Sequence, residues 1–176
     1  KVDVGEVWIG NMADCGYSAG CHRGYKLGIG ATLDFYFINQ WVGNMLVLHL
    51  YEPFDDNTWH YAVVTHNGTS DESGVHIYID NVLKEHSVHT NTLSETTVND
   101  LPFKISGTGL IDEVTIWNYP LSQEEIEANT YNLTGVEGGL LAYWDFNQSV
   151  SDQSSNGNDG TIYGNVTYST DVPVPG

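Results

Sequence analysis

The sequence predicts an all-β protein, a jelly-roll β-sandwich of two antiparallel sheets with one short helix. Short segments rich in β-branched and aromatic residues recur along the chain, for example at 59–65 and 75–79, and such residues favour strands. Turn sequences containing Gly, Asn and Asp separate these segments, and a single segment carries the signals of a helix start. The 176 residues suffice for one domain with a buried core.

The expected strands occur at the regular spacing that is typical of a sandwich or barrel. A polar, Gly-containing loop at 152–160 precedes the last of them. In chain order, the expected strands are 4–9, 24–29, 33–38, 45–51, 59–65, 75–79, 82–88, 109–117, 139–146 and 161–168.

The expected helix covers 123–128. Ser122 precedes it as an N-cap, and Glu125 stands at the third helical position, which completes a capping box. The acidic residues of this first turn also suit the positive end of the helix dipole.

The strongly negative net charge of the chain excludes or disfavours several classes of binding partner. It has 23 Asp and Glu against 5 Lys and Arg, which gives a formal net charge of -18. Phosphate contacts need clustered basic residues, so this composition excludes a general nucleic-acid binder and disfavours anionic membranes and sulfated ligands. No apolar run approaches the roughly 20 residues that span a bilayer, and we expect no membrane insertion.

The only two cysteines, Cys15 and Cys21, are separated by a Gly-rich loop. In an exported protein they would form a local disulfide, which would stabilise the fold by about 2 kcal/mol in the chain-entropy model. Two free thiols in a cytosolic protein are the alternative. We expect the disulfide, because the spacing suits no zinc site without a second cysteine pair.

Four segments carry a resemblance to a known family: 59–65, 75–81, 109–117 and 121–126. Their order resembles the laminin G-like and pentraxin-like members of the concanavalin A-like jelly-roll superfamily, over residues 25–146. We therefore expect a single domain at 1–170 that lacks its first strands, followed by a linker at 171–176. The tail at 140–170 either closes this domain by returning to the first sheet, which we favour, or begins a tandem repeat.

The resemblance implies a calcium site at the sheet rim, where similar domains commonly hold calcium with carboxylates. Asp112 is the residue at that position, and the loop beside it offers further oxygen ligands of the kind that calcium prefers. Solvated surface charge is the alternative reading of these residues. The expected ligands are Asp112, Asp152, Asn156 and Asp159.

We expect no catalytic residues. Jelly-roll glycosidases carry carboxylates on alternate strand positions, and no Glu-x-Asp-x-Glu run occurs here. Asp112 and Glu113 are adjacent, so on a strand they would point to opposite faces. The seven histidines raise the alternative of a zinc site, but we expect them to be solvent-exposed or structural, since His86 and His89 are three apart and would face opposite sides of a strand.

Sugar rings stack on exposed aromatic side chains, and Trp8, Trp41 and Tyr51 lie near loops or on strands that often build the concave sheet. The resulting hypothesis is a secreted or cell-surface, calcium-binding lectin-like module that recognises a polysaccharide or other glycan. Such a module would be joined to other domains of a larger parent chain, for example a polysaccharide-degrading enzyme. The alternative is a protein–protein, adhesion or spacer module without a sugar site.

Overall fold

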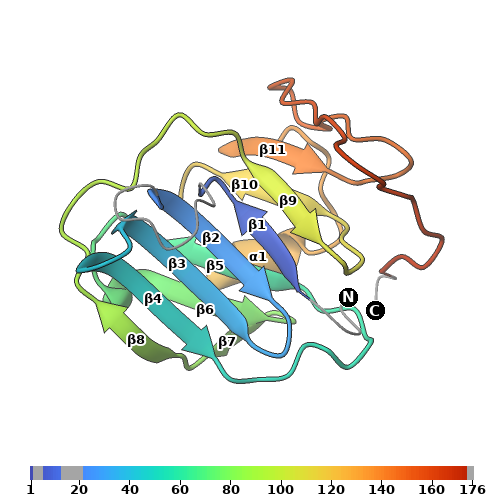
Figure 1. Ribbon diagram of the computed structural model, residues 1–176. Coiled ribbons are helices and arrows are strands. Elements are labelled where there is room, and N and C mark those ends of the chain that lie inside the picture. Colours follow the sequence, from blue (N-terminus) through green and yellow to red (C-terminus); the bar gives the residue numbers. More distant parts are fainter. Residues whose placement is uncertain (2–5, 13–21, 174–176) are drawn as a thin grey trace. The chain divides into compact units, whose positions relative to one another are not determined.

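The computed structural model describes residue 1, residues 6–12 and residues 22–173. The chain divides into two compact units, Lys1–Gly109 and Leu110–Gly176, and each is treated separately below (Figure 1). The prediction of an all-β jelly-roll sandwich with one short α-helix is confirmed.

The first unit contains a six-stranded sheet in which every neighbouring pair is antiparallel. Its spatial order is β8-β4-β3-β2-β1-β9. The strand bounds are β1 Val7–Gly10, β2 Gly24–Ile29, β3 Leu33–Gln40, β4 Asn44–Leu50, β8 Ser87–Asn91 and β9 Lys104–Gly107.

A three-stranded antiparallel sheet completes the first unit and lies behind the six-stranded sheet in the view of Figure 1. It consists of β5 Ala62–His66, β6 Val75–Ile79 and β7 Val82–Lys84, with a short 3₁₀ turn at Glu72–Gly74 before β6. Asp80 and Asn81 join β6 to β7 with φ angles of 51° and 65°. Positive φ at both central residues is the geometry that tight hairpins favour.

The core of the first unit lies between its two sheets. Side chains alternate along each strand, so one face of each sheet is apolar and meets the other. The fully or nearly buried members are Leu33, Phe35, Leu46, Leu48, Leu50, Phe54, Val75, Ile77 and Ile79.

The second unit holds the antiparallel pair β10 Val114–Trp117 and β11 Leu140–Trp144, with α1 Gln123–Asn129 between them in the chain. The capping box is confirmed: Ser122 Oγ accepts from the N–H of Glu125, and the Glu125 carboxylate accepts from the N–H of Ser122. The tail strand β11 pairs with β10. This pairing differs from the favoured expectation, in which the tail returns to the sheet that contains β1.

Three expected strands differ in the structure. The segment 82–88 is two strands, because β7 belongs to the three-stranded sheet and β8 to the six-stranded one. The strand expected from 109 begins only at Val114, since Glu113 has a φ of 53°, which extended strands do not adopt. Residues 161–168 form no strand: their β-prone side chains are exposed and have no neighbouring strand to pair with.

Candidate functional site

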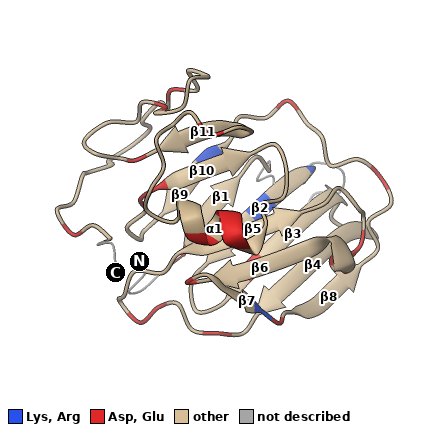
Figure 2. Cartoon of the chain, turned by 180° about the vertical axis from the view of Figure 1, so that it is seen from behind, with Lys and Arg blue, Asp and Glu red and all other residues tan. Residues whose placement is uncertain are grey.

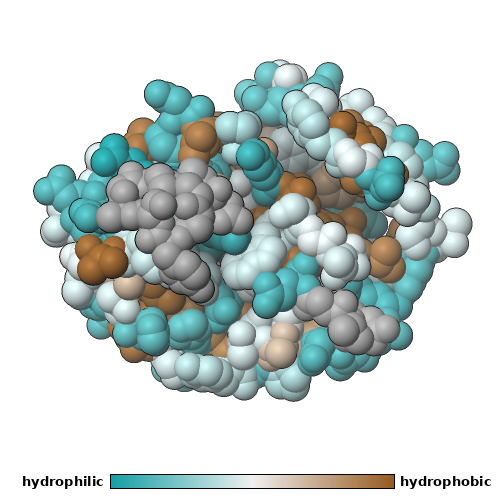
Figure 3. Space-filling model, in the orientation of Figure 1, coloured by the Kyte–Doolittle hydropathy of each residue, from teal (hydrophilic) through white to brown (hydrophobic). Residues whose placement is uncertain are grey.

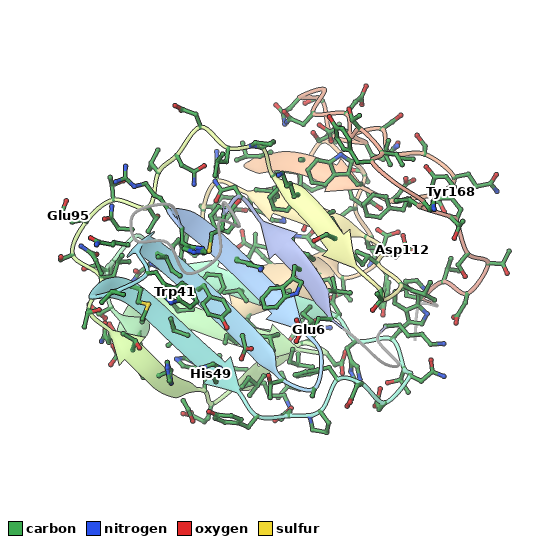
Figure 4. The ribbon with its side chains drawn as sticks, viewed as in Figure 1. Glu6, Trp41, His49, Glu95, Asp112 and Tyr168 are labelled. Carbon is green, nitrogen blue, oxygen red and sulfur yellow. The ribbon has the colours of Figure 1, made fainter. Side chains whose placement is uncertain are left out.

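The face of the six-stranded sheet that points away from the core, here called the outer face, is the candidate site. The pairing places Trp8, Gly28, Asp34 and His49 in one row across β1, β2, β3 and β4. Each of these residues alternates with core residues on its own strand. In Figure 4 the outer face is turned toward the viewer, with Trp41 and His49 labelled on it.

Aromatic rings cross this face in a continuous series. The ring centroids of Trp8 and Tyr36 are 6.3 Å apart, and the Tyr36 and Trp41 rings stack with the same separation at an interplanar angle of 20°. Trp41 also contacts the ring of His22, at 5.0 Å. We call Trp8, Tyr36 and Trp41 the aromatic cluster.

Two neighbours hold Trp8 in place. A Cβ at Gly28 would lie 2.3 Å from Cζ3 of Trp8, so the indole crosses the strand at a position where only glycine fits. The ammonium of Lys26 lies 3.5 Å from the Trp8 ring centroid, which is a close cation–π contact. The ring of Trp8 is therefore covered on one side by a charged group of the protein itself.

Polar groups lie beside the aromatic cluster. His49 Nδ1 is 2.5 Å from Asp34 Oδ1, and the exposed Tyr51 stacks on His49 with ring centroids 5.7 Å apart. Burial, with the nearby charges of Asp34 and Glu6, raises the pKa of Tyr36 to about 12. The Tyr36 hydroxyl therefore stays protonated, and able to donate a hydrogen bond, to a higher pH than an ordinary tyrosine.

Comparison with known protein families gives one match. A family model described as the concanavalin A-like lectin/glucanases superfamily matches residues 2–127. The chain belongs to this superfamily. No curated protein and no solved structure matches the chain.

For this member of the concanavalin A-like superfamily, all three aromatic residues predicted to stack on sugars lie at the outer face. Trp8 and Trp41 are linked through Tyr36, while Tyr51 stands with His49. Sequence reasoning missed Tyr36, although its alternation with buried Phe35 could have indicated an outward position.

Sequence reasoning also missed the polar pair. Asp34 follows the buried Leu33, and His49 stands between the buried Leu48 and Leu50. A polar side chain at every second position of an apolar strand indicates the face that points away from the core. This alternation was the available signal for both residues.

Two of the residues expected to bind calcium in the 152–159 loop, Asp152 and Asn156, form hydrogen bonds with the backbone of the loop and of β11. The Asp152 carboxylate accepts four hydrogen bonds, from N–H of Tyr143 (3.0 Å), Ser154 and Asn158 (2.8 Å each) and from the Ser154 hydroxyl (2.8 Å). The side-chain amide of Asn156 donates to the carbonyls of Leu140 and Leu141. Asp152 and Asn156 therefore hold the loop against β11.

The same loop protects a strand edge. Asn158 also donates its side-chain amide to the carbonyl of Leu141 on β11, and Asp159 accepts from the N–H of Asp152. Unpaired backbone groups of an edge strand need such partners. The abundance of Asp, Asn and Ser in this loop follows from that structural role.

Asp112 lies in a separate acidic cluster with Glu113 and Asp145. Burial raises the pKa of Asp112, and the charge of Asp145 raises it further against the effect of the Glu113 N–H. Burial likewise raises the pKa of Glu113, with Asp112 and Asp145 adding to the shift, although the Tyr143 hydroxyl donates to Glu113 at 2.5 Å. The charge of Asp145 acts on both adjacent carboxylates. Asp112 and Glu113 lie before the start of β10 and not on a strand, so the expectation of opposite strand faces does not apply to them.

The surroundings of these acidic residues bear on whether they could bind a metal ion. In the described ranges, no three His, Cys, Asp or Glu side chains are grouped so that they could hold a metal ion. Calcium at Asp112 stays a prediction, now with Glu113 and Asp145 as its neighbours. Cys15 and Cys21 lie outside the described residues, so their disulfide also stays a prediction.

Proposed function

We propose that the outer face of the six-stranded sheet binds a carbohydrate. The carrying observation is the aromatic cluster, which places three partly exposed rings side by side next to Asp34. Sugar rings bind proteins by stacking their C–H faces on aromatic rings while their hydroxyls bond to polar side chains. The outer face offers both kinds of contact.

The charges favour an uncharged glycan. Acidic residues far outnumber basic ones over the chain, as Figure 2 shows in red and blue. Near the aromatic cluster, Asp34 and Glu6 act on the pKa of Tyr36, and Lys26 is engaged with Trp8. An anionic sugar would meet repulsion that a neutral one avoids.

The surface chemistry agrees with a polar ligand. In Figure 3, which views the molecule from the direction of Figure 1, the visible brown apolar residues outside the area covered by grey form separate patches among teal and white ones. A stable protein–protein interface usually has a more apolar centre. This observation favours the carbohydrate proposal over an adhesion surface on the same face.

Membership of the superfamily also supports a proposal about the kind of protein that contains this domain. We propose a module that binds without catalysis and belongs to a secreted or cell-surface protein with further domains. In the described parts of the chain, no helix has the length and apolar character needed to cross a membrane.

The test is a glycan array run with calcium and with EDTA, followed by calorimetry on the best neutral glycan. Tyr51 is 69% exposed, so Tyr51→Ala removes a ring with little effect on folding. We expect a loss of roughly 1–3 kcal/mol in binding, by analogy with aromatic stacking on bases. Tyr163→Ala is the matched control, because Tyr163 is 85% exposed and lies in the second unit.

Lys26→Met probes the cation–π contact directly. The substitution removes the charge beside the Trp8 ring and keeps an apolar side chain of similar length, so we expect affinity for a neutral glycan to be kept or increased. An array without any bound glycan would refute the proposal. Equal losses from Tyr51→Ala and Tyr163→Ala would show that binding lies elsewhere than on the outer face.

A further inference from the structure

We propose that His49 and His89 together bind one transition-metal ion of the zinc type at the outer face, with Asp34 as a positioning residue. This proposal does not require carbohydrate binding, and the two proposed sites share the outer face and Asp34. It rests on the orientation of His49, on the strand irregularity that presents His89, and on the distance between the two rings.

Asp34 determines which nitrogen of His49 is available. His49 Nδ1 lies 2.5 Å from Asp34 Oδ1, and the two side chains are 18% and 22% exposed. With a proton on Nδ1 donated to the carboxylate, Nε2 carries the lone pair that a metal needs. A carboxylate behind a ligating histidine is the common arrangement in metal sites, where it sets the tautomer and the ring orientation.

A β-bulge brings His89 beside His49. His49 pairs with Ser87 and Leu48 with Val88, but Val47 pairs with Thr90, so His89 is the additional residue on β8. Bulges re-aim side chains and are common next to functional sites. The regular alternation of β8 is interrupted at the residue that approaches His49.

The ring geometry suits two imidazoles on one ion. The His49 and His89 centroids are 5.0 Å apart with an interplanar angle of 82°. Two histidines bound to a tetrahedral ion through bonds of about 2.0–2.1 Å hold their ring centres roughly 5 Å apart. Among the described residues, neither His49 Nε2 nor either nitrogen of His89 has a hydrogen-bond partner.

Other histidines differ from this pair. His60 has both ring nitrogens engaged, Nδ1 with Asp80 and Nε2 with Asp56 and Thr58. His66 Nε2 donates to the carbonyl of Thr69. His76 is exposed on β6 in the other sheet.

Two protein ligands define the kind of site. The described residues supply no third His, Cys, Asp or Glu to the ion, so water would complete its coordination and the metal would exchange readily. Imidazole ligands suit Zn²⁺, Cu²⁺ and Ni²⁺ and not Ca²⁺ or Mg²⁺, which prefer oxygen. The net charge of -18 raises the local concentration of cations generally.

The experiment is calorimetric titration of the full chain with Zn²⁺, together with ¹⁵N spectra of the histidine rings. We expect Zn²⁺ to shift His49 Nε2 and one nitrogen of His89 while His76 stays unchanged. His89→Ala should weaken binding at least tenfold, and the matched control His76→Ala should not. Both side chains are exposed, so neither substitution threatens folding.

Asp34→Asn tests positioning. We expect it to weaken Zn²⁺ binding about 10–100-fold, the usual effect of losing such a carboxylate, and to change the His49 tautomer seen in the ¹⁵N shifts. The proposal is overturned if the wild type takes up no Zn²⁺, or if the ions bound shift histidines other than His49 and His89. Unchanged affinity in His89→Ala would overturn it as well.

Discussion

Replacing Asp152 by alanine should destabilise the second unit strongly. Three backbone N–H groups and one hydroxyl converge on this carboxylate. The N–H groups of Tyr143 and Ser154 are partly buried, whereas that of Asn158 is exposed and regains water in the variant. Leaving a fully buried donor unpaired costs about 1–3 kcal/mol, and two such donors would cost about 2–6 kcal/mol. Because both N–H groups are only partly buried, we expect the lower part of that range, about 2–4 kcal/mol.

The assays are thermal unfolding and amide hydrogen exchange. A loss of this size corresponds to roughly 5–15 °C in Tm for a chain of this length. The amide of Tyr143 should exchange faster, because Asp152 Oδ1 is the acceptor of its N–H. Asp100→Ala is the matched control, since Asp100 is exposed and makes no hydrogen bond among the described residues.

The pH dependence gives a second readout. Burial raises the pKa of Asp152, but the N–H groups of Tyr143, Asn158 and Ser154 outweigh it and hold the pKa below its usual value. The stabilisation is therefore present above the unfolded-state pKa and is lost as the pH falls through the folded-state value. The difference between wild type and Asp152→Ala should shrink below about pH 4. A variant that melts with the wild type and keeps its Tyr143 protection would refute the structural role of this carboxylate.

Two further predictions concern ionisable groups. Burial lowers the pKa of His60, but hydrogen bonds with Asp80 and Asp56 raise it above its ordinary value, so its stabilisation is present below the unfolded-state pKa and lost as the pH rises through the folded-state one. Denaturant unfolding should show a larger loss from His60→Gln below about pH 6 than above about pH 8, and equal losses would contradict this contact. If calcium binds at Asp112, EDTA should lower the Tm of the wild type and leave Asp112→Asn unaffected. If it does not bind, EDTA should change neither, and Asp112→Asn should be the more stable protein because one of several mutually repelling charges is gone.

Local patterns predicted the elements that depend on local physics. The alternation in 33–38 and 45–51 gave β3 and β4 to within two residues at each end, and the Ser122 capping box gave the start of α1. The break after Lys84 depends on which sheet each half of the segment joins, and no local signal in 82–88 contains that information. Residues 161–168 show the converse case, in which strand-forming side chains have no strand beside them.

The aromatic residues of the candidate site could be predicted from the sequence, but the contacts between residues on different strands could not. The places of Trp8, Trp41 and Tyr51 near loops or on strands predict them as ligand-stacking rings, and the sheet order brings them to one face. The contact between His49 and His89 depends on a bulge in β8, which shifts the pairing by one residue. A shift of this kind arises only when two strands meet, so spacing along the chain could not reveal it.

The two acidic regions show how one residue type serves different ends. Loop residues that bind calcium and loop residues that cap backbone groups are both Asp and Asn near Gly, so composition alone does not separate them. Their partners do: the oxygens of Asp152 are saturated with N–H and O–H donors, which occupy the lone pairs that a cation would need. Asp112 instead accepts a hydrogen bond from a single N–H, that of Glu113, and lies close to the charge of Asp145. Its carboxylate retains the capacity that Asp152 has used, so of these two residues Asp112 is the better candidate for the predicted calcium site.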